Sequence, residues 1–177
     1  MDTRDRSVWS DFDRYAQECL RRSSFDLGRY PVPPLARALV LPALGTTTGY
    51  ALYRVATDSI VGVSLRWGWA RDERSIARML TTDVPDSLEP HVTSSAVSVD
   101  SHGVDELTKR LLAARVPAMP GPGSIGLDGV SYELAFGEWY HGARFHWWLQ
   151  PPSGWQPLGA FLHGMIQLID TALAQLR

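Results

Sequence analysis

The stretch Leu127–Leu158 constrains the fold most strongly, because it holds two short segments in which large apolar residues alternate with polar or small ones. Alternation with a period of two is typical of β-strands that bury one face. We therefore predict strands over Ser131–Phe136 and Ala143–Gln150. Pro151 and Pro152 cannot donate hydrogen bonds inside a sheet, so the second strand must end before them.

The apolar residues also predict how these strands pair. If Tyr132, Leu134 and Phe136 share a buried face with Phe145, Trp147 and Leu149, antiparallel pairing places Leu134 near Phe145 and Tyr132 near Trp147. The opposite face then carries Ser131, Glu133, Ala135, Arg144, His146, Trp148 and Gln150.

A helix is expected directly after this hairpin. Pro157 suits the first helical position, where its missing N–H costs nothing, and apolar residues follow at helical spacing as far as Leu176. This apolar stripe should lie across the hairpin and cover Phe145 and Trp147.

The rest of the chain predicts three more strands and three more helices. The strands are expected over Thr48–Ala56, Ile60–Trp69 and Val92–Val99, and the serines of the last favour an open face or an edge position. The helices are expected over Ser10–Arg22 with Ser10 or Asp11 as the cap, over Asp72–Leu80, and from Asp100 or Ser101 to Val116. The proline-rich segment Asp26–Gly45 is interpreted as irregular chain with one helical turn at Leu35–Leu39.

The expected fold is a single α+β domain over residues 1–177, in the order αββαβαββα. The sheet should be antiparallel, with about five strands and helices packed on it. A length of 177 residues with 45% hydrophobic content suits one substantial core.

Composition excludes several classes of function. The net charge is −2, and sixteen arginines and one lysine are offset by nineteen acidic residues, so no broad basic surface for nucleic acid is expected. We expect neither a signal peptide nor a membrane-spanning stretch. Cys19 is the one cysteine; it cannot form an internal disulfide and is interpreted as a core residue. We expect a bacterial, cytoplasmic protein.

No cofactor or metal is expected. Gly121, Gly123 and Gly126 form a literal G-x-G-x-x-G, but a helix precedes it and a strand follows, the reverse of a dinucleotide site. The five histidines are scattered, and His141 and His146 fall on opposite faces of extended chain.

Glu133, Arg144 and His146 are the candidate catalytic residues, because the predicted register brings them together beside Trp148. They could act as a general acid/base pair with an orienting cation. The commoner outcome for such a set is a cross-strand charge pair on a solvated face, so a catalytic role is the lesser expectation.

Candidate partner-binding residues fall into two groups. Aromatic and imidazole side chains at the hairpin tip and on the open sheet face suit a contact surface, although the tip tryptophan could also fold back onto the sheet. Three arginines at helical spacing could receive an acidic partner, although a solvated helix face is the commoner reading. These residues are Trp139, Tyr140, His141 and Trp148 in the first group and Arg71, Arg74 and Arg78 in the second.

The C-terminal third resembles a known group of proteins. Its residues read L-D-G-V-S-Y-E-L, then R-F-H-W-W, then P-x-G-W-x-P-L and a final apolar helix. Over Leu127–Leu173 this pattern resembles small uncharacterised bacterial α+β proteins, some of which are immunity proteins that neutralise polymorphic toxins. The resemblance implies a protein partner, such as a secreted toxin domain.

We therefore expect a non-enzymatic binding protein, and the resemblance implies the toxin-neutralising immunity type. The alternative is a small-molecule-binding domain or a hydrolytic enzyme that uses Glu133, Arg144 and His146. A third reading is a domain that serves only to pair with itself.

Overall fold

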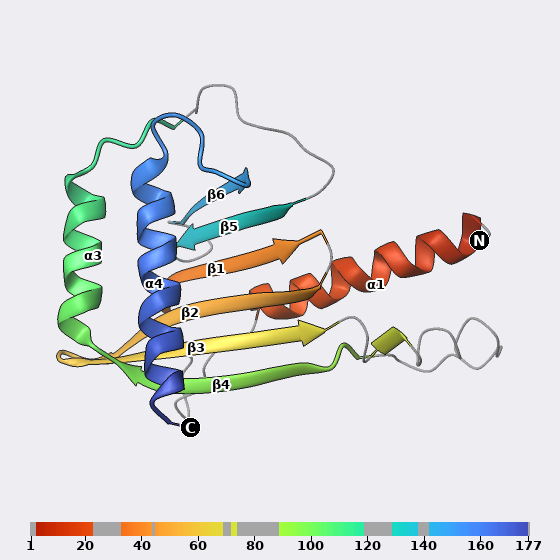
Figure 1. Ribbon diagram of the computed structural model, residues 1–177, viewed down its shortest axis with the longest axis horizontal. Coiled ribbons are helices and arrows are strands. Elements are labelled where there is room, and N and C mark those ends of the chain that lie inside the picture. Colours follow the sequence, from red (N-terminus) through yellow and green to blue (C-terminus); the bar gives the residue numbers. More distant parts are fainter. Residues whose placement is uncertain are drawn as a thin grey trace.

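The computed structural model describes residues 3–22, 33–43, 45–68, 72–73, 89–118, 129–137 and 142–176. These residues form one antiparallel sheet in the order β4-β3-β2-β1-β5-β6, with helices on both of its faces (Figure 1). Along the chain the elements are α1 (Thr3–Arg22), β1 (Pro34–Pro42), β2 (Thr46–Ala56), β3 (Ser59–Gly68), β4 (Val92–Val99), α3 (Ser101–Ala113), β5 (Val130–Phe136), β6 (Ala143–Trp148) and α4 (Gln156–Ala174).

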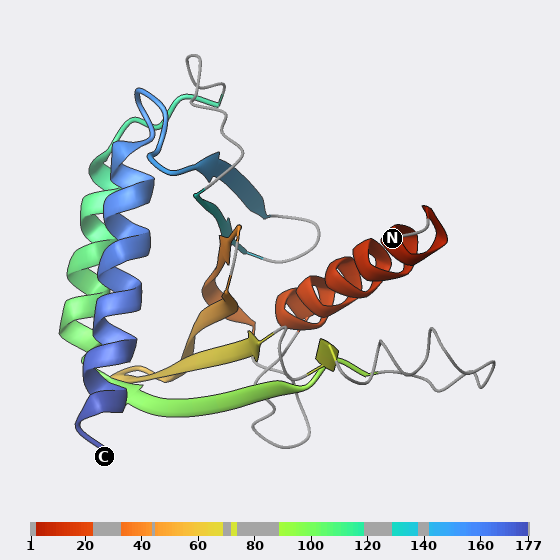
Figure 2. The same ribbon diagram turned by 45° about the vertical axis from the view of Figure 1, so that its right-hand side comes forward.

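One face of the sheet, the α4 face, is covered by α4 with α3 beside it (Figure 2). Pro157 lies in the first turn of α4, as expected from its missing N–H. Asp100 caps α3 by accepting hydrogen bonds from the backbone N–H groups of His102 and Gly103. The buried core between this helix pair and the sheet consists of Ala36, Ala38, Tyr50, Leu52, Ile60, Val97, Val99, Val104, Leu134, Trp147, Trp155, Leu158, Phe161, Leu162, Met165 and Ile169.

The other face, the α1 face, is partly covered by α1. Phe12, Ala16 and Leu20 recur at helical spacing and are buried against apolar residues of β1, β2 and β3. Trp67 anchors this second core, with its ring centroid 6.1 Å from that of Phe12. Helices on both faces mean that the central strands are buried on two sides.

The proline-rich segment contains a strand, so the expected irregular chain with a helical turn at Leu35–Leu39 is wrong. β1 pairs with β2 on one side and with β5 on the other. Its two prolines, Pro34 and Pro42, occupy its ends, where a missing N–H is tolerated. Ala36 and Ala38 face α4 whereas Leu39 faces α1. Because both faces are buried, the strand lacks the apolar–polar alternation that identifies a half-buried strand.

The pairing of the C-terminal hairpin is confirmed. Leu134 lies opposite Phe145 and Tyr132 opposite Trp147, and α4 covers this side of the hairpin. The α+β class and the antiparallel sheet are confirmed as well, with six strands instead of about five.

Two predictions at the ends of elements are wrong. The first helix begins at Thr3, so Ser10 and Asp11 lie inside it and cannot cap it. β6 ends at Trp148, and Leu149, expected on the buried face, has φ of 55° and is 51% exposed, because the chain turns there ahead of two prolines. Of the helix expected over Asp72–Leu80, residues 72 and 73 are helical and the others lie outside the described residues, as does the glycine-rich loop over 119–128.

Candidate functional site

The candidate site lies on the α1 face, where β1, β5 and β6 are neighbours. Arg37, Ala135 and Arg144 occupy one row across these strands, because Ala135 pairs with both arginines. Glu133 occupies the next row, with His146 directly opposite it on β6. The structure therefore places all three candidate catalytic residues on one face, as the register predicted.

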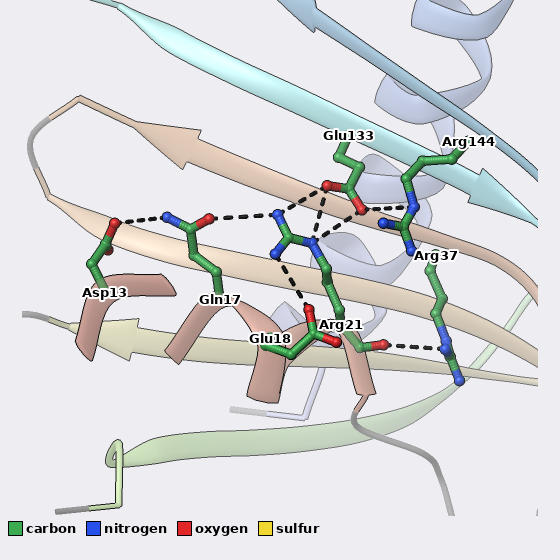
Figure 3. Close-up of polar contacts among 7 residues, drawn as sticks. All are labelled: Asp13, Gln17, Glu18, Arg21, Arg37, Glu133 and Arg144. Atoms are coloured by element: carbon green, nitrogen blue, oxygen red, sulfur yellow. Dashed lines mark hydrogen bonds and ion pairs between the residues drawn. The ribbon is translucent and has the colours of Figure 1, made fainter. Parts of the chain in front are cut away.

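The carboxylate of Glu133 is the centre of an ion-pair cluster (Figure 3). The Nε of Arg21, near the end of α1, donates to both carboxylate oxygens at 3.2 and 3.1 Å, and its Nη2 lies 3.1 Å from Oε2. On the other side, the Nε of Arg144 lies 3.4 Å from Oε1. Glu133 is only 8% exposed, so these guanidinium groups replace most of the water that a carboxylate requires.

Residues of α1 hold Arg21 in place. The Oε1 of Gln17 lies 3.5 Å from Nη2 of Arg21, and the Nε2 of Gln17 donates to Asp13 at 2.9 Å. Glu18 lies 3.6 Å from Nη1 of the same arginine. Burial raises the pKa of the Asp13 carboxyl group, and the hydrogen bond from Gln17 and the charge of Arg21 oppose this shift.

Arg37 joins the end of α1 to the sheet. Its Nη1 donates a hydrogen bond of 3.1 Å to the backbone carbonyl of Arg21, one of the last carbonyls of the helix, which lack partners within it. A cation at this end also interacts favourably with the helix dipole. The Nε of Arg37 is buried and has no hydrogen-bond partner among the described residues.

This arrangement suits structural pairing better than proton transfer. A general base must reach a substrate proton, whereas both oxygens of Glu133 already accept from arginines in a largely buried position. His146 is exposed, and no hydrogen bond between it and Glu133 is present in the described part of the chain. The cluster therefore ties α1 to the hairpin and fixes the position of Arg144.

Of the remaining predicted site residues, the structure describes only Trp148. Trp148 is half-buried on the α1 face, where its ring lies against the backbone of Gly129. The tip residues Trp139, Tyr140 and His141 and the helical arginines Arg71, Arg74 and Arg78 all lie outside the described residues.

Sequence reasoning missed the two arginines that complete the cluster. Arg21 is separated from Glu133 by 112 positions, and no local pattern links them. Its place just after the buried Leu20, at the edge of the apolar stripe of α1, was the one available signal. Arg37 lay in the segment that was interpreted as irregular.

A second polar contact, also missed, lies on the α4 face. The hydroxyl group of Tyr50 lies 3.3 and 3.5 Å from the carboxylate oxygens of Asp170 on α4. Burial, followed by the charge of Asp170 and its hydrogen bond, raises the pKa of Tyr50 to about 12, and the charge of Arg66 opposes the shift. This contact connects α4 to the middle of the sheet.

No group of three metal-ligating side chains converges within the part of the chain that the structure describes. In the same ranges, no helix has the length and apolar composition needed to cross a membrane. The chain has no significant match to a protein-family model, a curated protein or a solved structure.

Proposed function

We propose that this protein is a non-enzymatic binding protein that recognises a protein partner through the β6 surface, defined as Arg144, His146, Trp148 and Leu149. One observation carries the proposal. The only carboxylate of the candidate catalytic set is buried in ion pairs, whereas the cation beside it is exposed to solvent. The carboxylate of Glu133 is therefore engaged within the protein, whereas the side chain of Arg144 is accessible to a partner.

The side chain of Arg144 is partly preorganised for binding a partner. Its side chain is 65% exposed, yet its Nε is held by Glu133, so part of the conformational entropy of a free arginine is already lost before a partner binds. Arginine and tryptophan are over-represented among residues that dominate binding energy. Trp148 lies on the same face of the same strand, and Leu149 is exposed directly after it.

The C-terminal third resembles small bacterial α+β proteins that include immunity proteins, and this resemblance supports a more specific version of the proposal. An inhibitor that neutralises a toxin by covering its surface needs a rigid contact area and no catalytic group. The β6 surface, mounted on a six-stranded sheet, meets that requirement.

The test begins with capture of a partner from native extract, its identification, and measurement of the binary affinity with both proteins purified. Arg144→Glu and Trp148→Ala are each expected to weaken binding at least about tenfold, as for residues at the centre of an interface. Lys109→Glu is the matched control, since it makes the same change of charge at a 69% exposed position on α3, on the other side of the sheet.

Two results would contradict the proposal. Equal loss of affinity in the control and in Arg144→Glu would show a non-specific effect of charge. A hydrolytic or small-ligand activity that disappears in His146→Ala while partner binding is unchanged would favour the alternative use of Glu133, Arg144 and His146.

A further inference from the structure

The two edge strands of the sheet, β4 and β6, are protected to different degrees. β6 has six residues, and its Arg144 and His146 are exposed; short length and charge are common devices against pairing with another chain. β4 has eight residues, V-T-S-S-A-V-S-V, without charge or proline. Among the described residues it pairs only with β3, so its outer backbone groups are open to a further strand.

The side chains of β4 would not obstruct such a strand. Thr93, Ser94, Ser95, Ala96 and Ser98 are all exposed, and all are small. Adjacent strands lie about 4.8 Å apart, and side chains of this size allow that approach on both faces. Within the described part of the chain, these five positions are therefore accessible to a further strand.

The end of α4 provides a second observation. α4 extends past β4, and Leu176, which follows its last turn, is 70% exposed (Figures 1 and 2). On the α4 face, α4 packs on Val97 and Val99 in the C-terminal half of β4. Thr93 and Ser95, in the other half of the strand, remain exposed on that same face.

We propose that two copies of this chain pair antiparallel through β4, around a two-fold axis perpendicular to the sheet near Ala96. This is the axis that makes the edge strands antiparallel while keeping both α4 helices on one face. The two sheets of six strands then become one continuous sheet. The two-fold axis places the C-terminal half of one β4 beside the N-terminal half of the other. The end of α4 with Leu176 from each copy therefore lies above Thr93 and Ser95 of the other copy.

The residues of β4 suit a second copy. Around Ala96, the register opposes Ser94 with Ser98 and Ser95 with Val97 of the other copy, pairs that contain neither like charges nor bulky groups. An edge without charge has nothing to repel its own copy, and it offers no charged or large side chain with which to select a different partner. In the symmetric pair, the exposed leucine of each copy can also contact the methyl group of Thr93 of the other copy.

The test is sedimentation velocity of the full chain over a wide range of concentration. The wild type is expected to form a concentration-dependent dimer. Ala96→Asp and Ala96→Lys each place like charges opposite one another at the axis and are expected to weaken dimerisation by more than about tenfold. Mixing the two variants opposes unlike charges and is expected to restore the dimer.

A second pair of variants tests the helix end. Leu176→Asp is expected to weaken the dimer, whereas Leu112→Asp, at an 80% exposed leucine on α3, is expected to leave it unchanged. A wild type that stays monomeric at every concentration would overturn the proposal, as would a dimer that persists in both Ala96 variants. If circular dichroism shows that one Ala96 variant does not fold, the other variant and the leucine pair still decide the question.

Discussion

The hydroxyl group of Tyr50 has a pKa of about 12 because it is buried beside the carboxylate of Asp170. The folded pKa is higher than the unfolded value, which lies near 10. The folded state therefore binds the proton more tightly, and the contribution of Tyr50 to stability is complete below about pH 10 and is lost as the pH rises through about 12.

Replacement of Asp170 by Asn should lower the pKa of Tyr50, because it removes a negative charge beside the phenol. Burial is the larger cause of the shift, so the pKa should stay above the usual value. A titration of tyrosinate absorbance measures this, and Tyr50→Phe identifies the signal by removing it. An unchanged titration in Asp170→Asn would show that the carboxylate does not act on this phenol.

The ion pair between Arg21 and Glu133 makes a testable contribution to stability. Arg21→Met leaves a buried carboxylate with only the long contact from Arg144, and we expect a loss of about 2 kcal/mol in the free energy of unfolding. The double variant Arg21→Met/Glu133→Leu should recover at least half of this loss, because it removes the unpaired charge as well.

Urea unfolding of both variants measures these differences. Arg14→Met is the control, since the Arg14–Asp11 pair on the same helix is exposed and should contribute no more than about 0.5 kcal/mol. If the double variant is no more stable than Arg21→Met, the unpaired carboxylate is not the source of the loss.

The predictability of this cluster depended on the distance between its residues along the chain. Glu133, Arg144 and His146 belong to one hairpin, whose apolar pattern sets the register and hence the faces. Arg21 reaches the site from a helix at the other end of the sequence, and Arg37 from a strand hidden in a proline-rich segment. Only packing in three dimensions brings Arg21 to the carboxylate of Glu133 and Arg37 to the backbone carbonyl of Arg21.

Among the elements, β3 and α4 approach one another closely at Gly62. A Cβ atom at this position would lie 2.6 Å from Cγ1 of Ile169 and 2.9 Å from Cγ1 of Val99. Gly62→Ala should therefore force α4 or β4 to shift, and we expect a loss of about 2 kcal/mol.

Gly68, at the end of the same strand, is the matched control. The nearest atom to a Cβ there is Oγ1 of Thr46 at 3.8 Å, an ordinary van der Waals distance that leaves room for a methyl group. Thermal unfolding of both variants makes the comparison. Equal losses at the two positions would mean that the cost of alanine arises in the strand backbone and not in packing against α4.

Element type was predictable where one face of an element is buried and the other solvated. The two strands of the C-terminal hairpin, β4 and α4 all show that contrast in sequence. β1 does not, because helices cover both of its faces, and its flanking prolines were interpreted as signs of irregular chain when they mark its ends.

At the scale of the whole molecule, the helices on the two faces are held unequally. α4 buries six residues, whereas the described side chains of α1 that are fully buried are Phe12, Ala16 and Leu20, supplemented by the Arg21 ion pair. We therefore expect α1 to detach from the sheet as a unit before global unfolding occurs.

Hydrogen exchange followed by mass spectrometry tests this expectation. Amides of α1 should exchange faster than those of α4, and Arg21→Met should accelerate exchange in α1 without changing it in α4. Equal rates in both helices would show that α1 opens only with the rest of the molecule.

The position of β1 has a consequence for how the chain assembles. β1, β2 and β3 follow one another along the chain through short connections and β4 follows after a longer one, whereas the pairing of β1 with β5 joins Ala36 to Phe136. Contacts between distant positions form late, because closing a long loop costs entropy before the strands gain from pairing. Most of the chain must therefore leave the ribosome before β1 can pair with β5. Until then β1 is a second open edge of the sheet, at which newly made chains can associate wrongly.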